Sequence, residues 1–172
     1  MVVVHVISVV FGMGSALVSD VLFSFFSKDK KLTTMEISTL SILSQVVVYS
    51  LVVIFLSGTV LFLSDVDRYM NSAKFLSKMS ILSVLLFNGY VLNKYIWPHL
   101  LNQKFFTLKK ERNIRRLAFA CGAVSVISWL AVCTLGVLDK LDFTYLSIIL
   151  AYLLTIIFGV VVALCIEKKE LN

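Results

Sequence analysis

Two side chains that can carry charge stand inside one long apolar stretch near the start of the chain. The stretch HVISVVFGMGSALVSDVLF begins at His5 and contains Asp20. A histidine in apolar surroundings can ligate haem iron or a metal ion, or relay protons. An aspartate there needs a partner for its charge, and such residues usually face the interior of a helical bundle. At ~1.5 Å per residue of helix the two lie about 22 Å apart, so they predict two separate sites.

The composition indicates the environment of these residues. The chain has 172 residues, of which 59% are hydrophobic and 15% charged, and its mean hydropathy is +0.96. A soluble domain has about 45–50% apolar and about 25% charged residues, so this excess predicts a membrane protein. Cys121, Cys133 and Cys165 all fall in apolar runs and are expected to be free, buried thiols. No Lys or Arg precedes Lys28, so the first run is expected to remain as a helix rather than act as a cleaved signal peptide.

Five apolar runs are long enough to cross a hydrocarbon core, which takes roughly 20 helical residues. Short polar segments separate them. Because every backbone polar group in lipid needs an internal partner, each run is expected to form a helix. The sequence therefore predicts an all-α fold in one domain over 1–172, a bundle of five transmembrane helices spanning approximately 2–27, 38–63, 75–98, 116–138 and 142–166.

The basic residues predict how this bundle is oriented. Twelve of the 16 lie on one side of the predicted membrane: Lys28, Lys30, Lys31, Lys94, Lys104, Lys109, Lys110, Arg112, Arg115, Arg116, Lys168 and Lys169. The other four are Arg68, Lys74, Lys78 and Lys140. The positive-inside rule then places the N-terminus outside and the C-terminus in the cytoplasm, in the cytoplasmic (inner) membrane of a cell. Because the basic residues flank apolar runs, we expect anionic lipid headgroups as their partner, and not nucleic acid.

Four polar residues fall at a similar depth in the cytoplasmic half of the first three predicted helices. They are Asp20, Gln45, Asn93 and Lys94. We expect them to form an intramembrane polar cluster, because buried charges find partners. Such a cluster could fix helix packing, or it could handle protons or ions. Alternatively, Lys94 extends to the headgroups and pairs with nothing in the bundle.

Small residues recur at four-residue spacing on the first predicted helix. Ser8, Gly12 and Ala16 lead to Asp20 on one face. A stripe of small residues lets another helix approach closely, so we assign these three residues to helix packing.

His5 is expected near the outer membrane face, where Thr59, Lys78 and Met79 lie at matching depth. His99, the other histidine, falls at the cytoplasmic end of the third run, so one haem could not take both imidazoles under this topology. Haem b or copper held by His5, with Lys78 and Met79 beside it, remains one interpretation. The alternative is a histidine that only hydrogen-bonds to a neighbour.

The first three runs also share motifs with a known family. The early histidine is followed by VVFGMG, the second run ends in LSGTVLFL, and the third opens with SAKFLSKMSILSVLLFNGYVL. Over roughly residues 1–100 the pattern resembles the core of the copper-resistance D family and of the HemJ-type membrane protoporphyrinogen oxidases. This resemblance implies a small helical bundle near haem or copper chemistry, with His5 and Lys78 as functional residues. HemJ-like proteins carry a further histidine late in the third helix, where this chain has Asn88, Gly89 and Asn93.

Motifs of catalysis and nucleotide binding are missing from the sequence, including GxSxG, HExxH and the P-loop. We therefore expect the protein not to be an enzyme. Three classes of function remain. We expect first that the protein is a non-catalytic accessory or assembly subunit, which binds other membrane protein subunits. The alternatives are a haem- or metal-associated redox protein that uses His5, and a small proton-coupled transporter that uses the Asp20 cluster.

Overall fold

The computed structural model describes residues 1–27, 32–100, 112–138 and 143–171, and the regular structure in this part of the chain is entirely helical. Five helical segments are long and apolar enough to cross a membrane, which confirms the predicted all-α bundle of five transmembrane helices. The elements in chain order are α1 (Val2–Ser27), α2 (Thr34–Leu63), α3 (Val66–Met70), α4 (Ala73–Val91), the π-helical turn η1 (Leu92–Ile96), α5 (Trp97–Leu100), α6 (Arg112–Val137) and α7 (Tyr145–Leu171). The run α4–η1–α5 forms the third of the five long segments.

Local hydrogen bonds determine where the helices α2 and α3 begin. α2 begins at Thr34, several residues before the predicted start at 38, because Thr33 and Glu36 form a capping box. The Thr33 backbone N–H donates to the Glu36 carboxylate at 2.7 Å, and the Glu36 N–H donates to the Thr33 hydroxyl at 3.3 Å. In the next polar segment Asp65 caps the short helix α3 by accepting from the Arg68 N–H.

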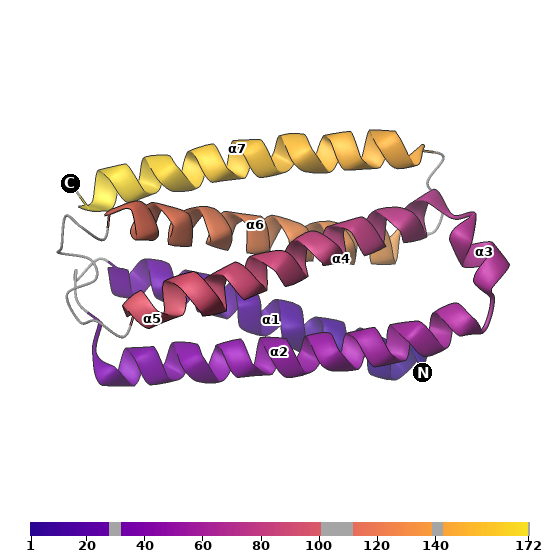
Figure 1. Ribbon diagram of the computed structural model, residues 1–172, viewed down its shortest axis with the longest axis horizontal. Coiled ribbons are helices and arrows are strands. Elements are labelled where there is room, and N and C mark those ends of the chain that lie inside the picture. Colours follow the sequence, from indigo (N-terminus) through magenta and orange to yellow (C-terminus); the bar gives the residue numbers. More distant parts are fainter. Residues whose placement is uncertain (28–31, 101–111, 139–142, 172) are drawn as a thin grey trace.

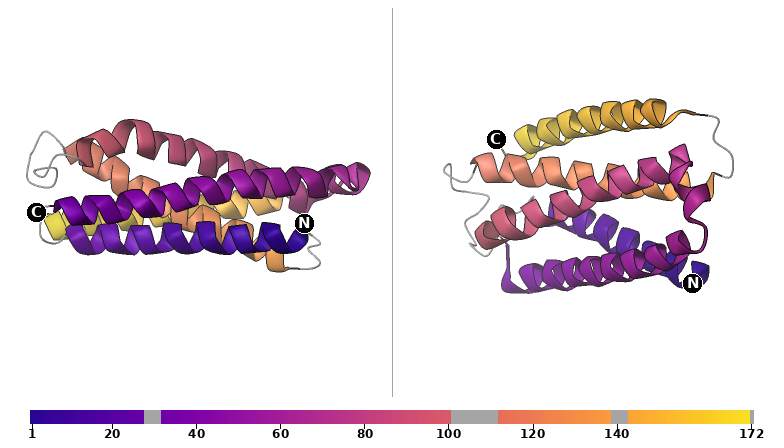
Figure 2. Two further views of the ribbon diagram at one scale, coloured as in Figure 1. Left: turned by 90° about the horizontal axis from the view of Figure 1, so that it is seen from below. Right: turned by 45° about the vertical axis from the view of Figure 1, so that its right-hand side comes forward.

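The helices pack as neighbours along the chain, except for one oblique crossing. α1 and α2 form a closely packed pair, and α7 lies at the edge of the bundle against α6. α4 runs obliquely across the bundle: it lies near α7 at the end that carries α3 and nearer to α1 at the other end (Figures 1 and 2). α2 and α4 therefore diverge toward α3 and barely touch along their lengths.

The two termini lie at opposite ends of the bundle (Figure 1). Their assignment to the outside and the cytoplasm remains a prediction. Among the basic residues that support it, Arg112, Arg115, Arg116, Lys168 and Lys169 lie at the end of the bundle that carries the C-terminus. Lys28, Lys30, Lys31, Lys104, Lys109, Lys110 and Lys140 fall outside the described residues, as does position 142, where the fifth span was predicted to begin.

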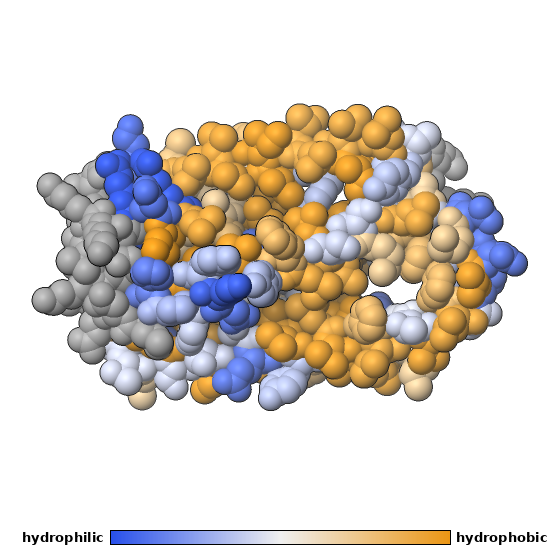
Figure 3. All heavy atoms as spheres, viewed as in Figure 1, coloured by the Kyte–Doolittle hydropathy of each residue, from blue (hydrophilic) through white to orange (hydrophobic). Residues whose placement is uncertain are grey.

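Apolar side chains cover the middle of the bundle, and hydrophilic residues gather toward its ends (Figure 3). Many large apolar residues of α1, α2 and α7 are more than half exposed, including Phe11, Phe55 and Phe158. Such a surface is costly in water, and lipid tails satisfy it. The structure is that of an integral membrane protein.

The centre of the bundle depends on a close approach between α1 and α6. The Trp129 side chain of α6 is 2% exposed and packs with Ala16, Ile54 and Leu85. A Cβ atom on Gly12 would lie only 2.7 Å from Cη2 of Trp129 and 3.1 Å from Cβ of Ser50. Gly12 is therefore the position where the backbone of α1 meets the indole ring, as the stripe of small residues predicts.

We expect Gly12→Ala to lower the thermal stability of the purified protein, with a loss of about 1–3 kcal/mol, because the added methyl group overpacks a rigid, buried ring. Gly14→Ala is the matched control, since nothing lies within 4 Å of its added Cβ, and alanine favours a helix over glycine. Thermal unfolding in one detergent compares the two. Equal stability of both variants would contradict the packing of Gly12 against Trp129.

Candidate functional site

The divergence of α2 from α4 leaves a cavity of about 450 Å³ inside the bundle. Residues of α1, α2, α4, η1 and α6 line it. Figure 3 shows the surface hollowed between α4 and α2, toward the end that carries α3. The cavity follows from the oblique crossing of α4, because side chains of α2 and α4 that would otherwise interdigitate stand apart.

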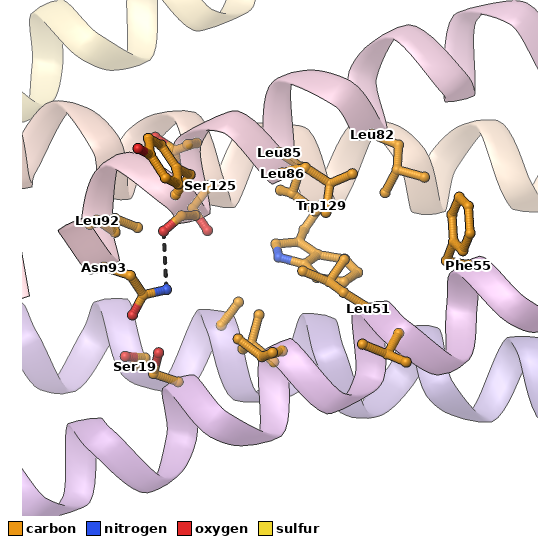
Figure 4. Close-up of a pocket in the computed structure, with 18 of the residues that line it drawn as sticks. Ser19, Leu51, Phe55, Leu82, Leu85, Leu86, Leu92, Asn93, Ser125 and Trp129 are labelled. Atoms are coloured by element: carbon orange, nitrogen blue, oxygen red, sulfur yellow. Dashed lines mark hydrogen bonds between the residues drawn. The ribbon is translucent and has the colours of Figure 1, made fainter.

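The lining of the cavity is apolar at one end and polar at the other. Leu51, Phe55, Leu82 and the ring of Trp129 lie toward one end, whereas Ser19, Asn93 and Ser125 lie toward the other (Figure 4). The polar part of the lining consists of Ser19, Asp20, Ser44, Asn88, Asn93 and Ser125, beside the partly polar Tyr90 and Trp129. The cavity thus matches an amphipathic molecule rather than a wholly apolar or a wholly polar one.

The mouth of the cavity opens at the depth of the hydrocarbon core. Its rim includes Val52, Phe55 and Leu86, whose exposed fractions are 53%, 58% and 48%. These residues lie well inside the membrane-spanning segments Thr34–Leu63 and Ala73–Leu100. A molecule dissolved in the lipid phase could therefore reach the cavity directly.

Asp20 lies at the polar end of the cavity, against α6. Its Oδ1 is 3.2 Å from the position that a Cβ on Gly122 would occupy, so the glycine makes room for the carboxyl group. Its Oδ2 is buried and has no hydrogen-bond partner among the described residues. A buried polar atom without a partner is rare and costs free energy, which marks this carboxyl group as a candidate contact for a ligand.

Three of the four residues predicted to form the inner cluster line two adjoining pockets. Asp20 and Asn93 line the main cavity, and Asn93 also lines a smaller pocket with Gln45. Lys94 lies elsewhere. Its Nζ donates to the Tyr90 hydroxyl at 2.5 Å and sits 5.1 Å and 5.7 Å from the ring centroids of Tyr90 and Tyr95. Among the described residues, no ion pair joins Lys94 to Asp20.

Asn93 and Lys94 lie in the π-helical turn η1 (Leu92–Ile96). In this turn the Trp97 N–H donates to the Leu92 carbonyl, one residue further back than in an α-helix. Pro98 follows directly and has no N–H to continue an α-helical ladder. Such wide turns within α-helices occur frequently at functional sites.

At the other end of α1, His5 is held by a hydrogen bond to α2. Its Nδ1 lies 2.9 Å from the hydroxyl of Ser57, which is buried and donates to the Val53 carbonyl at 2.6 Å. Because a hydroxyl has one hydrogen to donate, Ser57 must accept from the Nδ1–H of His5. The imidazole therefore keeps its lone pair on Nε2.

The other residues predicted beside His5 are only partly arranged around it. Lys78 lies within electrostatic range of the imidazole, whereas the Met79 side chain is exposed. Ser57, and not Thr59, supplies the hydrogen bond from α2. His99 lies in α5, at the opposite end of the bundle from His5 (Figure 1). Within the described residues, no three His, Cys, Asp or Glu side chains gather as a metal site would require.

The residues assigned to helix packing lie on the buried face of α1. Ser8 and Ala16 are buried, the Ser8 hydroxyl donates to the Val4 carbonyl at 2.8 Å, and Gly12 faces Trp129. Ala16 also lines the main cavity. The same stripe thus packs helices and forms part of the cavity wall.

Several residues that form polar contacts in the structure were not predicted from the sequence. The Asn88 amide donates to the Cys121 carbonyl at 3.0 Å, and the Ser128 hydroxyl lies 2.8 Å from that of Tyr152. Glu167, which is buried, lies 3.9 Å from Arg115 and 3.6 Å from Arg116, measured from their Nε atoms. These residues lie at matching depth on neighbouring helices, and this depth could have been used to predict the pairs.

Comparison with known protein families, with curated proteins and with solved structures finds no match to this chain. A functional assignment therefore rests on the chemistry of the site.

We expect Ser57→Ala to destabilise the protein by about 1 kcal/mol, because it removes the hydroxyl group that accepts from the His5 Nδ1–H. Nitrogen NMR of the labelled imidazole should show the Nδ1–H tautomer in the parent protein and a mixture of tautomers in the variant. Thr59→Val is the matched control, since the Thr59 hydroxyl only donates to the Phe55 carbonyl of its own helix. An unchanged tautomer in Ser57→Ala would contradict the assigned hydrogen bond.

Proposed function

We propose that this chain is a non-catalytic integral membrane protein that binds a small amphipathic molecule taken up from the lipid phase between α2 and α4. The observation that carries the proposal is the position of the cavity: its mouth lies among exposed apolar residues within the membrane-spanning segments, and polar groups line one of its ends. A molecule that partitions into a bilayer can place its apolar part at the apolar end and its head at the polar end, where Asn93 is exposed.

The size and lining of the cavity support a binding role. A volume of about 450 Å³ falls within the range of about 300–1,000 Å³ that is typical of ligand pockets. Such pockets combine an apolar wall with a few convergent polar groups, as this one does. Asp20 is the one charged residue among those that line it. Among the described residues, no hydrogen bond joins a serine hydroxyl of the lining to the Asp20 carboxyl group, which favours binding over catalysis.

This proposal connects two of the function classes that the sequence leaves open. A protein that holds an amphipathic molecule could present it to other membrane subunits, which is the accessory role, or release it on the other side, which is transport. Both roles use the same cavity. We place the protein in the cytoplasmic membrane with the N-terminus outside, on the distribution of its basic residues.

The residues around His5 do not fit a haem or copper centre well. The Nε2 lone pair of His5 offers one ligand atom. Met79 is exposed, and the described residues bring no cluster of three ligand side chains to this end of the bundle. The resemblance to the copper-resistance D and HemJ-type proteins thus remains a prediction about ancestry, and we derive no reaction step from it.

We expect the fluorescence of Trp129 to be quenched by a neutral brominated fatty alcohol dissolved in the membrane, although the indole is almost fully buried, because the ring forms part of the cavity wall. The measurement uses Trp97→Phe, which leaves Trp129 as the single tryptophan, in lipid nanodiscs. Quenching should saturate as the alcohol fills the cavity.

Ser125→Leu in the same background should reduce this quenching several-fold, since Ser125 lines the cavity and leucine fills part of it. The control is Thr134→Leu, which adds the same side chain at an exposed position of α6. Quenching that is absent, or that rises linearly without saturation and ignores Ser125→Leu, would contradict a lipid-accessible binding cavity.

A further inference from the structure

We propose that the polar end of the cavity binds the primary amine of an amphipathic cation, with Asp20 as its counter-ion. This inference rests on the binding function proposed above and assigns the chemical class of the molecule bound. The cavity supplies negative charge and hydrogen-bond acceptors at one end and apolar walls along the rest of its length. An alkyl-chain amine has the complementary arrangement.

The carboxyl group of Asp20 has an oxygen without a partner in the described part of the chain. Its Oδ2 is buried and accepts no hydrogen bond from the described residues. A carboxylate at this depth in a membrane is costly unless a donor or a cation reaches it. The lining residues include no Lys, Arg or His that could supply one. A cationic molecule that enters the cavity supplies this charge, whereas an empty site leaves the carboxyl group to be protonated.

Lys94, the basic residue near this site, makes its contacts elsewhere. Lys94, on the same turn as Asn93, directs its Nζ to the Tyr90 hydroxyl and lies over the rings of Tyr90 and Tyr95. These contacts place its charge on aromatic rings, where a cation is stabilised. Lys94 is exposed and does not line the cavity, so it leaves the site of Asp20 open to another cation.

The two asparagine side chains that line the cavity are held with their amide nitrogens toward backbone carbonyls. The Nδ2 of Asn88 donates to the Cys121 carbonyl at 3.0 Å, and the Nδ2 of Asn93 donates to the Gly89 carbonyl at 3.1 Å (Figure 4 shows the second bond). Because carbonyl oxygens only accept, both amides are fixed with nitrogen toward the backbone. Each Oδ1 therefore remains an acceptor, and neither accepts from the described residues.

Together these groups select the head of the ligand. Asp20, Asn88 and Asn93 all offer oxygen acceptors at the same end of one cavity. A primary ammonium group presents three donors and a positive charge, whereas a carboxylate or phosphate presents only acceptors and a quaternary ammonium presents no N–H. The serine hydroxyls of the lining can donate or accept, so the negative charge of Asp20, beside the two asparagine oxygens, is what favours a primary amine over each of these heads.

The apolar part of the ligand extends toward Trp129. Asp20 faces Gly122, and Gly12, eight residues earlier on α1, faces Trp129. At ~1.5 Å per residue, the head and the indole are separated by about 12 Å along the helix axis. An unbranched alkyl chain of moderate length spans this distance, so its middle carbons lie near the indole ring.

The test compares three probes that have the same alkyl chain and different head groups: dodecylamine, dodecanol and dodecanoate. Each is brominated near the middle of its alkyl chain. The Trp97→Phe protein is placed in phosphatidylcholine nanodiscs, which carry no net charge, and quenching of Trp129 is followed against the mole fraction of each probe in the membrane. We expect half-saturation by the amine at a mole fraction about tenfold or more below that of the alcohol, since hydrogen bonds to charged groups are the stronger ones.

In Asp20→Asn the mole fractions of the alcohol and of the amine at half-saturation should become similar, so that their ratio is close to one. Asp67→Asn, which neutralises an exposed acid on α3, should leave this ratio unchanged. Should Asp20→Asn not fold, Asp20→Ser serves instead. It removes the carboxyl group and keeps a small polar side chain opposite Gly122, so the ratio should fall likewise.

The outcomes separate this inference from the function on which it rests. Equal half-saturation by amine and alcohol in the parent protein, or tighter binding of the carboxylate, would overturn the amine site and leave the cavity as a binding site. A ratio unchanged by Asp20→Asn or by Asp20→Ser would overturn the role of Asp20. Failure of all three probes to quench Trp129 saturably would overturn both proposals.

Discussion

The structure depends on the close approach of α1 to α6 where Gly12 meets Trp129. A membrane bundle gains little from burying apolar surface, because lipid is equally apolar, so tight contacts at small residues hold the helices together. Gly12 and Gly122 provide two such contacts between α1 and α6, about two turns apart on α6. With this pair fixed, α4 packs obliquely on α6, and the space between α4 and α2 stays open. The cavity is thus a consequence of how the other helices pack.

The same arrangement explains why polar groups can lie inside this bundle. Many hydroxyl groups of the described helices donate to a carbonyl one turn earlier, as Ser57, Ser77 and Ser128 do, which satisfies them within their own helix. Asn88 and Asn93 also donate to backbone carbonyls. Asp20 differs, because a carboxylate can only accept and the surrounding carbonyls offer no donor. Its need for a donor connects the fold to the proposed ligand.

Much of the fold follows from the sequence, whereas the cavity does not. Long apolar runs define five helices, and the spacing of Ser8, Gly12 and Ala16 identifies the packed face of α1, because period and residue size act locally. The oblique path of α4 depends on contacts between helices far apart in the sequence, so the cavity lined by Leu85 and Trp129 could not be predicted. Their depth in the sequence places Asp20 and Asn93 together, and both line the cavity. It could not show that Lys94 turns to Tyr90, because a flexible side chain at one depth can face several neighbours.

The most direct test of a lipid-accessible cavity is photolabelling with an alkyl diazirine dissolved in the bilayer, followed by mass spectrometry of the labelled residues. Leu85 and Ile81 lie one turn apart on α4 and are both buried, yet only Leu85 lines the cavity. We expect strong labelling of Leu85 and none of Ile81. The exposed Phe87 should be labelled as well and serves as the positive control. Labelling of Phe87 with Leu85 as protected as Ile81 would contradict a lipid-accessible cavity.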